Sequence, residues 1–195
     1  RECRLDSPEL TESIKQKQAP LIGVVLAGGL SRRMGEDKAL LPFQGSTLLQ
    51  HQLELLQPLC SRVLVSGDYA GFDCVPDATE RCGPLGGIYS IAQLHPNAAL
   101  LVIPIDMPQL TEQNLRHLMD CQQTCFIEGH PLPALFRHTE SLLKAINGIF
   151  DSPTPNFSIW HLHRVLNSLA LPLADFDGMN INEPQQWRDF KKGFQ

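Results

Sequence analysis

Glycines and cations gather in one short segment of this chain. Residues 26–38 read LAGGLSRRMGEDK and directly follow a run of β-forming residues. Gly28 and Gly29 allow the backbone to turn sharply and to bring its N–H groups close to a ligand. Three cations follow in the same segment, namely Arg32, Arg33 and Lys38. Backbone donors together with three cations suit a triphosphate, whose charge must be neutralised before an oxyanion can attack it.

The segment matches neither of the two best-known phosphate-binding loops. Its spacing departs from GxxxxGK[ST], and GxGxxG is also absent, which disfavours a dinucleotide-binding oxidoreductase. The plain alternative is a surface loop with solvated basic residues. The position of the segment after a buried strand favours a binding site, because open α/β sheets bind ligands at the carboxyl ends of their strands.

A second candidate is Asp106, which follows the apolar residues 99–103 and stands in the sequence PIDMP. Prolines on both sides restrict the backbone at this point. A carboxylate at the end of a strand would face the same crevice as the glycine loop. Mg²⁺ prefers one or two carboxylates together with phosphate oxygens and water, so Asp106 is predicted to bind Mg²⁺.

The elements that position these residues alternate along the chain. Short apolar runs predict strands at residues 21–26, 62–66, 72–76, 99–103 and 132–136. Helical patterns are expected at 47–57, 84–94, after Thr111, at 139–150, at 157–169 and from 183 towards 190. This alternation predicts an α/β fold, a three-layer αβα Rossmann-like domain with a mostly parallel sheet. Residues 1–20 are expected to form a flexible tail and residues 21–195 a single domain.

Composition excludes several classes of function. The net charge of −5 and the lack of a basic stripe argue against nucleic-acid binding. No apolar run approaches the roughly 18–20 residues of a membrane span. The polar N-terminal residues do not read as a signal peptide, and the six cysteines form no CxxC pair, so we expect a cytoplasmic protein with reduced thiols.

Four segments in a fixed order carry a family resemblance. They are residues 26–38, GPLGG at 83–87, IDMP at 105–108 and NINEP at 180–184. Together they resemble the molybdenum cofactor guanylyltransferases of the nucleotidyltransferase superfamily, whose fold is that of the nucleotide-diphospho-sugar transferases. The resemblance runs from about residue 21 to the C-terminus.

This resemblance implies an enzyme that uses GTP and Mg²⁺, attaches GMP to molybdopterin and releases pyrophosphate. It is also compatible with cofactor-delivery proteins or molybdoenzyme-specific chaperones as partners. Arg33, Lys38 and Asp106 would be catalytic, with Asp106 as the metal ligand. The implied nucleotide-binding residues are Leu26, Ala27, Gly28, Gly29, Lys38, Ser66, Asp77, Pro84, Leu85 and Asp106. The small residues at 29 and 83–87 favour GTP over CTP.

The acceptor side is less well determined. His130 lies in a segment that resembles the acceptor region, although a lone histidine is more often structural. One of Asn180 and Asn182 is expected to face the metal or the acceptor, but Asn182 could equally cap the following helix. Ser66 stands where the family often has Asn, and the region 152–169 lacks the paired arginines expected near a pterin.

Two alternatives remain open. One is a related nucleotidyltransferase that uses CTP or a sugar-phosphate acceptor. The other is a non-catalytic regulator that binds GTP without releasing pyrophosphate. The presence of Arg33, Lys38 and Asp106 counts against the regulator.

Overall fold

The structure is a computed structural model and describes residues 19–28, 37–77, 82–174 and 176–193. One seven-stranded sheet has the order β5-β4-β1-β6-β8-β7-β9. Its strands are β1 (Leu21–Leu26), β4 (Arg62–Ser66), β5 (Cys74–Val75), β6 (Ala99–Pro104), β7 (Cys125–Ile127), β8 (Ala134–Phe136) and β9 (Leu169–Leu171). β2 (Pro42–Phe43) and β3 (Ser46–Thr47) form a separate antiparallel pair.

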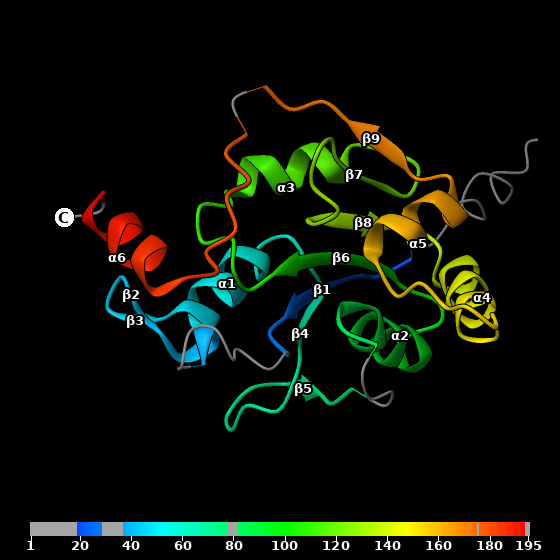
Figure 1. Cartoon of the computed structure of the whole chain (residues 1–195), viewed down its shortest axis with the longest axis horizontal. Coiled ribbons are helices and arrows are strands. Elements are labelled where there is room, and N and C mark those ends of the chain that lie inside the picture. The colour runs from blue at the N-terminus through cyan, green and yellow to red at the C-terminus, as the bar shows by residue number, and fades with distance from the viewer. Residues whose placement is uncertain (1–18, 29–36, 78–81, 175, 194–195) are drawn as a thin grey trace, which may run out of the picture.

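Helices cover both faces of the sheet, as Figure 1 shows. They are α1 (Leu48–Leu56), α2 (Pro84–Leu94), α3 (Glu112–Met119), α4 (Thr139–Phe150) and α5 (Ile159–Leu166). α6 (Pro184–Lys192) packs instead against Phe43 of β2, and a short 3₁₀ helix, η2 (Lys38–Leu40), precedes β2. Among the described residues, no helix is both long and apolar enough to traverse a lipid bilayer.

The sheet is mostly parallel, as predicted. β1 pairs in parallel with β4 and β6, and β4 pairs in parallel with β5. β8 runs antiparallel to both β6 and β7, whereas β7 and β9 are parallel to each other. The carboxyl ends of β1, β4 and β6 therefore meet at one edge of the sheet, where Ser66 ends β4 and where Gly28 and Asp106 follow β1 and β6.

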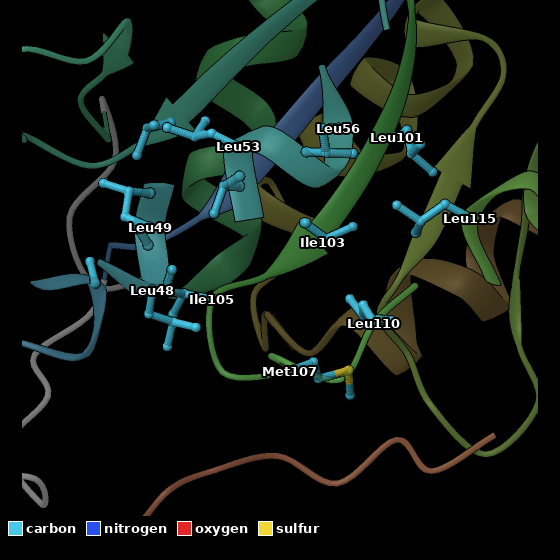
Figure 2. Close-up of a cluster of buried hydrophobic side chains, with 14 of the residues drawn as sticks. Leu48, Leu49, Leu53, Leu56, Leu101, Ile103, Ile105, Met107, Leu110 and Leu115 are labelled. Atoms are coloured by element: carbon cyan, nitrogen blue, oxygen red, sulfur yellow. The ribbon is translucent and has the colours of Figure 1, made fainter. Parts of the chain in front are cut away.

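Side-chain alternation along the strands builds two hydrophobic cores. In β6, Leu101 and Ile103 face one core while Leu100 and Val102 face the other. The first core packs beneath α1 and α3, and Figure 2 shows its leucines and isoleucines meeting Met107 and Leu110 from the chain after β6. The second core packs beneath α2, α4 and α5. Both faces of the parallel strands are thus buried, which explains their continuous apolar runs.

Several predicted elements need correction. The expected helix 157–169 ends at Leu166, because Asn167 adopts a left-handed conformation with φ of 49° and Leu169 enters β9. β7 and β9 are strands that the sequence did not predict. The predicted tail lies outside the described residues except for 19–20, so the division into a tail and one domain stays a prediction.

His163 is a core residue on α5 rather than a metal ligand. Its side chain is 3% exposed and stacks on Phe126, with ring centroids 4.2 Å apart. Its two ring nitrogens lie 3.0 Å from Ser168 Oγ and 2.9 Å from the Pro131 carbonyl oxygen. Burial lowers the pKa of His163 below its ordinary value, which the hydrogen bond to Pro131 partly opposes.

This burial predicts a pH dependence of stability. Because the folded pKa is lowered, the unfolded chain takes up the proton more readily, so stability is constant above about pH 6.5 and falls as the pH drops below it. Urea unfolding of the wild type and of His163→Gln at pH 7.5 and 5.5 measures this loss. The variant should lose less stability between the two values, whereas His138→Gln, a change at an exposed histidine, should behave as the wild type. Equal losses in the wild type and His163→Gln would contradict the prediction.

Candidate active site

The turn after β1 is fixed by the end of β4. The backbone N–H groups of Ala27 and Gly28 both donate to the Ser66 carbonyl oxygen, at 3.2 and 2.7 Å. A Cβ on Gly28 would come within 3.3 Å of that oxygen, so only glycine lets the two segments approach this closely without adjustment. Leu26 and Ala27 are buried and Gly28 is exposed. The chain therefore presents backbone, rather than side chains, at the end of β1.

Lys38 joins three distant parts of the sequence. Its Nζ donates to Asn182 Oδ1 at 2.8 Å and lies 3.5 Å from Asp106 Oδ2. The side chains of Lys38 and Asp106 are 14% and 19% exposed, so the pair is largely but not fully removed from solvent. Asp37 Oδ1 accepts from the Ala39 N–H at 3.0 Å and caps the 3₁₀ helix that carries Lys38. The structure thus brings two predicted catalytic residues together with one of the two asparagines.

The Asp106 carboxylate is under opposing influences. Burial raises the pKa of Asp106 above its ordinary value, while the Lys38 ammonium and its hydrogen bond act in the opposite direction. Ile105 and Met107 on either side are buried, and the Ile105 N–H donates to the Leu26 carbonyl oxygen at 3.2 Å. The carboxylate therefore sits on a rigid turn whose apolar neighbours restrict access of water.

The turn that carries Asp106 is also held by α1. Gln52, which is fully buried, donates from Nε2 to the Met107 carbonyl oxygen at 2.9 Å. His51 Nε2 lies 3.3 Å from the Pro108 carbonyl oxygen. Two carbonyls of the turn thus bond to side chains of a helix whose leucines pack in the first core, and the turn is fixed relative to the sheet.

A second polar cluster lies beside Gly28. Ser66, 2% exposed, donates from Oγ to Asp77 Oδ1 at 2.9 Å. A Cβ on Gly87 would lie 2.0 Å from Ser66 Oγ and 3.0 Å from Asp77 Oδ1, so the pair packs directly against the backbone of α2. Glycine at position 87 is therefore required by contact with these two side chains.

Tyr69 is a site residue that the sequence did not indicate. Its hydroxyl donates to the Ala27 carbonyl oxygen at 3.0 Å and lies 3.2 Å from Asp37 Oδ1. Burial and the neighbouring Asp37 raise the pKa of Tyr69, which keeps the hydroxyl protonated as a donor. Tyr69 thus links the residue after β1 to the residue before Lys38. An isolated tyrosine three residues beyond a strand gave no signal in the sequence.

The two asparagines and His130 can now be placed. Asn182 does not cap α6, whose N-cap is Glu183, because Pro184 occupies the first helical position; the capping prediction is wrong. Asn182 instead holds Lys38, while Asn180 is exposed and its side chain makes no hydrogen bond within the described part of the chain. The His130 ring packs against Gly178 and meets Phe176 edge-on, with centroids 5.1 Å apart.

The remaining predicted residues divide into three groups. Leu85 is fully buried in the second core, so its side chain cannot meet a nucleotide and only its backbone could. Pro84 is exposed at the start of α2. Gly29, Arg32 and Arg33 lie outside the described residues, and their roles stay predictions.

Comparison with known proteins agrees with this geometry. A family model for the MobA-like NTP transferase domain matches residues 23–148. A molybdenum cofactor guanylyltransferase from Xanthomonas euvesicatoria pv. vesicatoria is 38% identical over 180 residues, which cover 87% of this chain and 94% of that protein. A molybdenum cofactor biosynthesis bifunctional protein from Synechocystis is 34% identical over 190 residues, covering 87% of this chain and 53% of that protein.

Solved structures share the fold. Molybdopterin-guanine dinucleotide biosynthesis protein A from Archaeoglobus fulgidus superposes with a TM-score of 0.72 at 21% identity, covering 89% of this chain and 98% of that one. 2-C-methyl-D-erythritol 4-phosphate cytidylyltransferase from Thermus thermophilus gives a TM-score of 0.62 at 16% identity, with coverages of 89% and 98%. The predicted αβα fold of the nucleotide-diphospho-sugar transferase type is confirmed. The chain therefore belongs to the MobA-like NTP transferase family and is a nucleotidyltransferase.

Proposed function

We propose that this enzyme transfers GMP from GTP to molybdopterin, releases pyrophosphate and forms the guanine dinucleotide form of the cofactor. The observation that carries the proposal is the junction of Lys38, Asp106 and Asn182 beside the glycine turn, at the carboxyl edge of the parallel strands. The choice of GTP and molybdopterin as substrates rests on similarity to relatives that are named molybdenum cofactor guanylyltransferases. We further propose that the enzyme acts in the cytoplasm and passes its product to cofactor-delivery proteins or molybdoenzyme-specific chaperones.

On the nucleotide side, the backbone at Ala27 and Gly28 approaches the ligand, and Asp77 contributes a hydrogen-bonding carboxylate. Ser66 orients that carboxylate through its hydrogen bond to Oδ1. The absence of a side chain at Gly87 lets this pair pack directly against the backbone of α2, where we place the purine. Gly29, Pro84, the backbone of Leu85 and Arg33 complete the proposed nucleotide site, Arg33 by stabilising charge on the phosphates.

The residues present fit a divalent cation held largely by the substrate. Among the described residues, no cluster of three or more His, Cys, Asp or Glu side chains could hold a metal ion by itself. A single carboxylate such as Asp106 suits Mg²⁺, which retains water and phosphate oxygens as its other ligands. When bound, Mg²⁺ would neutralise phosphate charge. Asp106 is the residue that would hold it, with Asn180 and His130 on the proposed acceptor side.

Transfer then needs positioning and charge stabilisation. An oxygen of the terminal phosphate of the acceptor attacks the α-phosphorus of GTP in line, and the bond to the pyrophosphate oxygen breaks. A phosphate oxygen is already ionised at neutral pH, so no strong general base is required. Lys38 is held by Asn182 where it can offset the charge that accumulates on the phosphates.

The test is pyrophosphate release with Mg²⁺ and molybdopterin, comparing GTP, CTP and ATP. Release with GTP alone is the expected result. Release with CTP would overturn the choice of base, and release with a sugar phosphate but not molybdopterin would overturn the acceptor. Binding of GTP without release, beside an active control enzyme, would instead indicate a regulator.

Gly87→Ala should weaken GTP binding. The new Cβ would displace Ser66 Oγ and break its hydrogen bond to Asp77, so we expect a loss of about tenfold in affinity, the equivalent of one hydrogen bond. Isothermal titration with GTP measures the effect. The matched control is Gly148→Ala on α4, where a Cβ meets nothing within 4 Å; this change should leave binding intact and stabilise the protein by about 0.5–1 kcal/mol. Equal GTP affinities of Gly87→Ala and the wild type would refute the assignment of this cluster to the nucleotide site.

A further inference from the structure

A segment near the C-terminus passes close beside the turn that carries Asp106. We call residues 177–182 the strap; it precedes α6 and carries both asparagines. The Ile181 N–H donates to the Asp106 carbonyl oxygen at 2.8 Å, and the Ile181 side chain is 2% exposed in the first core. The next residue, Asn182, holds Lys38. The strap therefore contacts the backbone of Asp106 and the ammonium of Lys38, the two charged residues of the proposed catalytic junction.

Gln109 bonds the beginning of the strap to the turn that carries Asp106. Its Nε2 donates to the Asp177 carbonyl oxygen at 2.8 Å and also to the Met179 carbonyl oxygen. Both hydrogens of the amide nitrogen are thus used on the strap backbone. Gln109 Oε1 is buried and has no hydrogen-bond partner among the described residues. A buried acceptor without a partner costs free energy. The oxygen therefore does not favour this orientation of the amide, which is held by the two hydrogen bonds that the nitrogen donates.

His130 supports the strap at the residue between these two carbonyls. A Cβ on Gly178 would lie 2.2 Å from His130 Cε1, so the imidazole packs directly against the strap backbone. Only glycine at position 178 leaves room for the His130 ring against the backbone. The strap is thus held at residues 177, 178 and 179 before it reaches Asp106.

These contacts fix the register of the strap. An extended chain advances about 3.3 Å per residue and reverses the direction of successive side chains. A slip of one residue would therefore break the 2.8 Å hydrogen bond between Lys38 and Asn182 and turn the asparagine away. The side chains that anchor the far end, Ile181 and Trp187, are buried independently of Gln109. Loss of the Gln109 bonds should thus loosen the strap without unfolding the protein.

We propose that Gln109 is a positioning residue for nucleotidyl transfer: it holds the strap in the register that places Asn182 on Lys38 beside Asp106. The effect on rate rests on the proposed function, whereas the effect on the strap does not. Gln109 acts through Asn182 and touches no reacting atom.

The decisive variant is Gln109→Glu, which keeps the shape of the side chain but replaces the donor by a carboxylate facing two carbonyls. We expect kcat for pyrophosphate release to fall on the order of 10²-fold, as for a small misplacement of a catalytic group, with KM for GTP changed less than about threefold. Gln109→Arg, which supplies donors again, should recover part of the loss. Gln113→Glu, the same change at an exposed position of α3, is the matched control and should be neutral.

A double-mutant cycle separates positioning from general damage. If Gln109 acts through Asn182, Gln109→Glu should cost less than about twofold once Asn182→Ala is present. Additive losses would overturn the proposal. It would also be overturned if Asn182→Ala alone kept the wild-type rate, because nothing of catalytic value would then be positioned.

Hydrogen exchange supplies a readout that is independent of activity. Gln109→Glu should speed amide exchange across residues 179–182, including the Ile181 N–H, while the thermal midpoint stays close to that of the wild type. Unchanged exchange in the strap would overturn the proposal even if kcat fell. If the wild type released no pyrophosphate with any nucleotide, the proposed function would fail, and the exchange measurement would still decide whether Gln109 holds the strap.

Discussion

Replacing Asp106 by alanine is expected to lower pyrophosphate release on the order of 10³-fold, comparable to the loss of a group that stabilises transition-state charge. Asp106 is the carboxylate at the junction with Lys38, and it is the carboxylate that we propose to hold the cation. The fold should survive, because the strap bonds to the backbone carbonyl of Asp106 rather than to its side chain. Steady-state assays with saturating GTP, together with thermal unfolding, measure both effects.

Two further variants make this test specific. Asp106→Asn keeps the shape of the side chain and removes its charge, so it should be nearly as inactive as the alanine variant. Asp120→Ala, at an exposed aspartate that ends α3, should retain wild-type activity. Turnover of Asp106→Ala within tenfold of the wild type would refute the assignment of the metal-binding carboxylate.

Replacing Lys38 by alanine is expected to lower kcat/KM for GTP on the order of 10²-fold, because its ammonium stabilises phosphate charge directly. It should also cost about 1–2 kcal/mol of stability at neutral pH. The Asp106 carboxylate would lose its cation while remaining mostly buried, and a charge left without its partner is penalised. Asp106→Ala leaves the Lys38 ammonium with its hydrogen bond to Asn182 Oδ1, so Lys38→Ala is expected to unfold at a lower temperature than Asp106→Ala.

The comparison with other lysine variants tests this reasoning. Lys38→Arg keeps the charge but its planar fork does not match the compact ammonium, so we expect only partial activity. Lys144→Ala, at an exposed lysine on α4, should change neither activity nor stability. If Lys38→Ala lost activity but kept full stability, the pairing with Asp106 in the free enzyme would be unimportant.

The sequence determined the central strands and most helices because their signals are local. β1 and β4 have the predicted bounds, and β6 extends the predicted run by one residue, to Pro104. Strands buried on both faces read as continuous apolar runs. α2 begins at Pro84, where a proline is favoured in the first turn of a helix. Gly28 and Asp106, which follow two of these strands, were therefore placed correctly at one edge of the sheet.

The short strands at the other side of the sheet could not be predicted. β7 and β9 each have three residues, too few for a recognisable period. β7 is a strand because it forms hydrogen bonds with the edge of β8, and β9 is a strand because it forms hydrogen bonds with the edge of β7. The pairing of distant segments, rather than local propensity, decides this part of the sheet.

The roles of Asn182, Tyr69 and Gln109 were likewise decided by tertiary structure. The sequence left open whether Asn180 or Asn182 is functional and whether Asn182 caps a helix, and in the structure the Asn182 side chain bonds to Lys38, which lies 144 residues earlier. Tyr69 and Gln109 act on backbone groups of segments that are remote in sequence. The sequence by itself thus determined the fold class and predicted the residues of the candidate site. Only the tertiary structure decided which polar groups meet, because a hydrogen bond depends on the distance and angle between two atoms that the chain brings together from far apart.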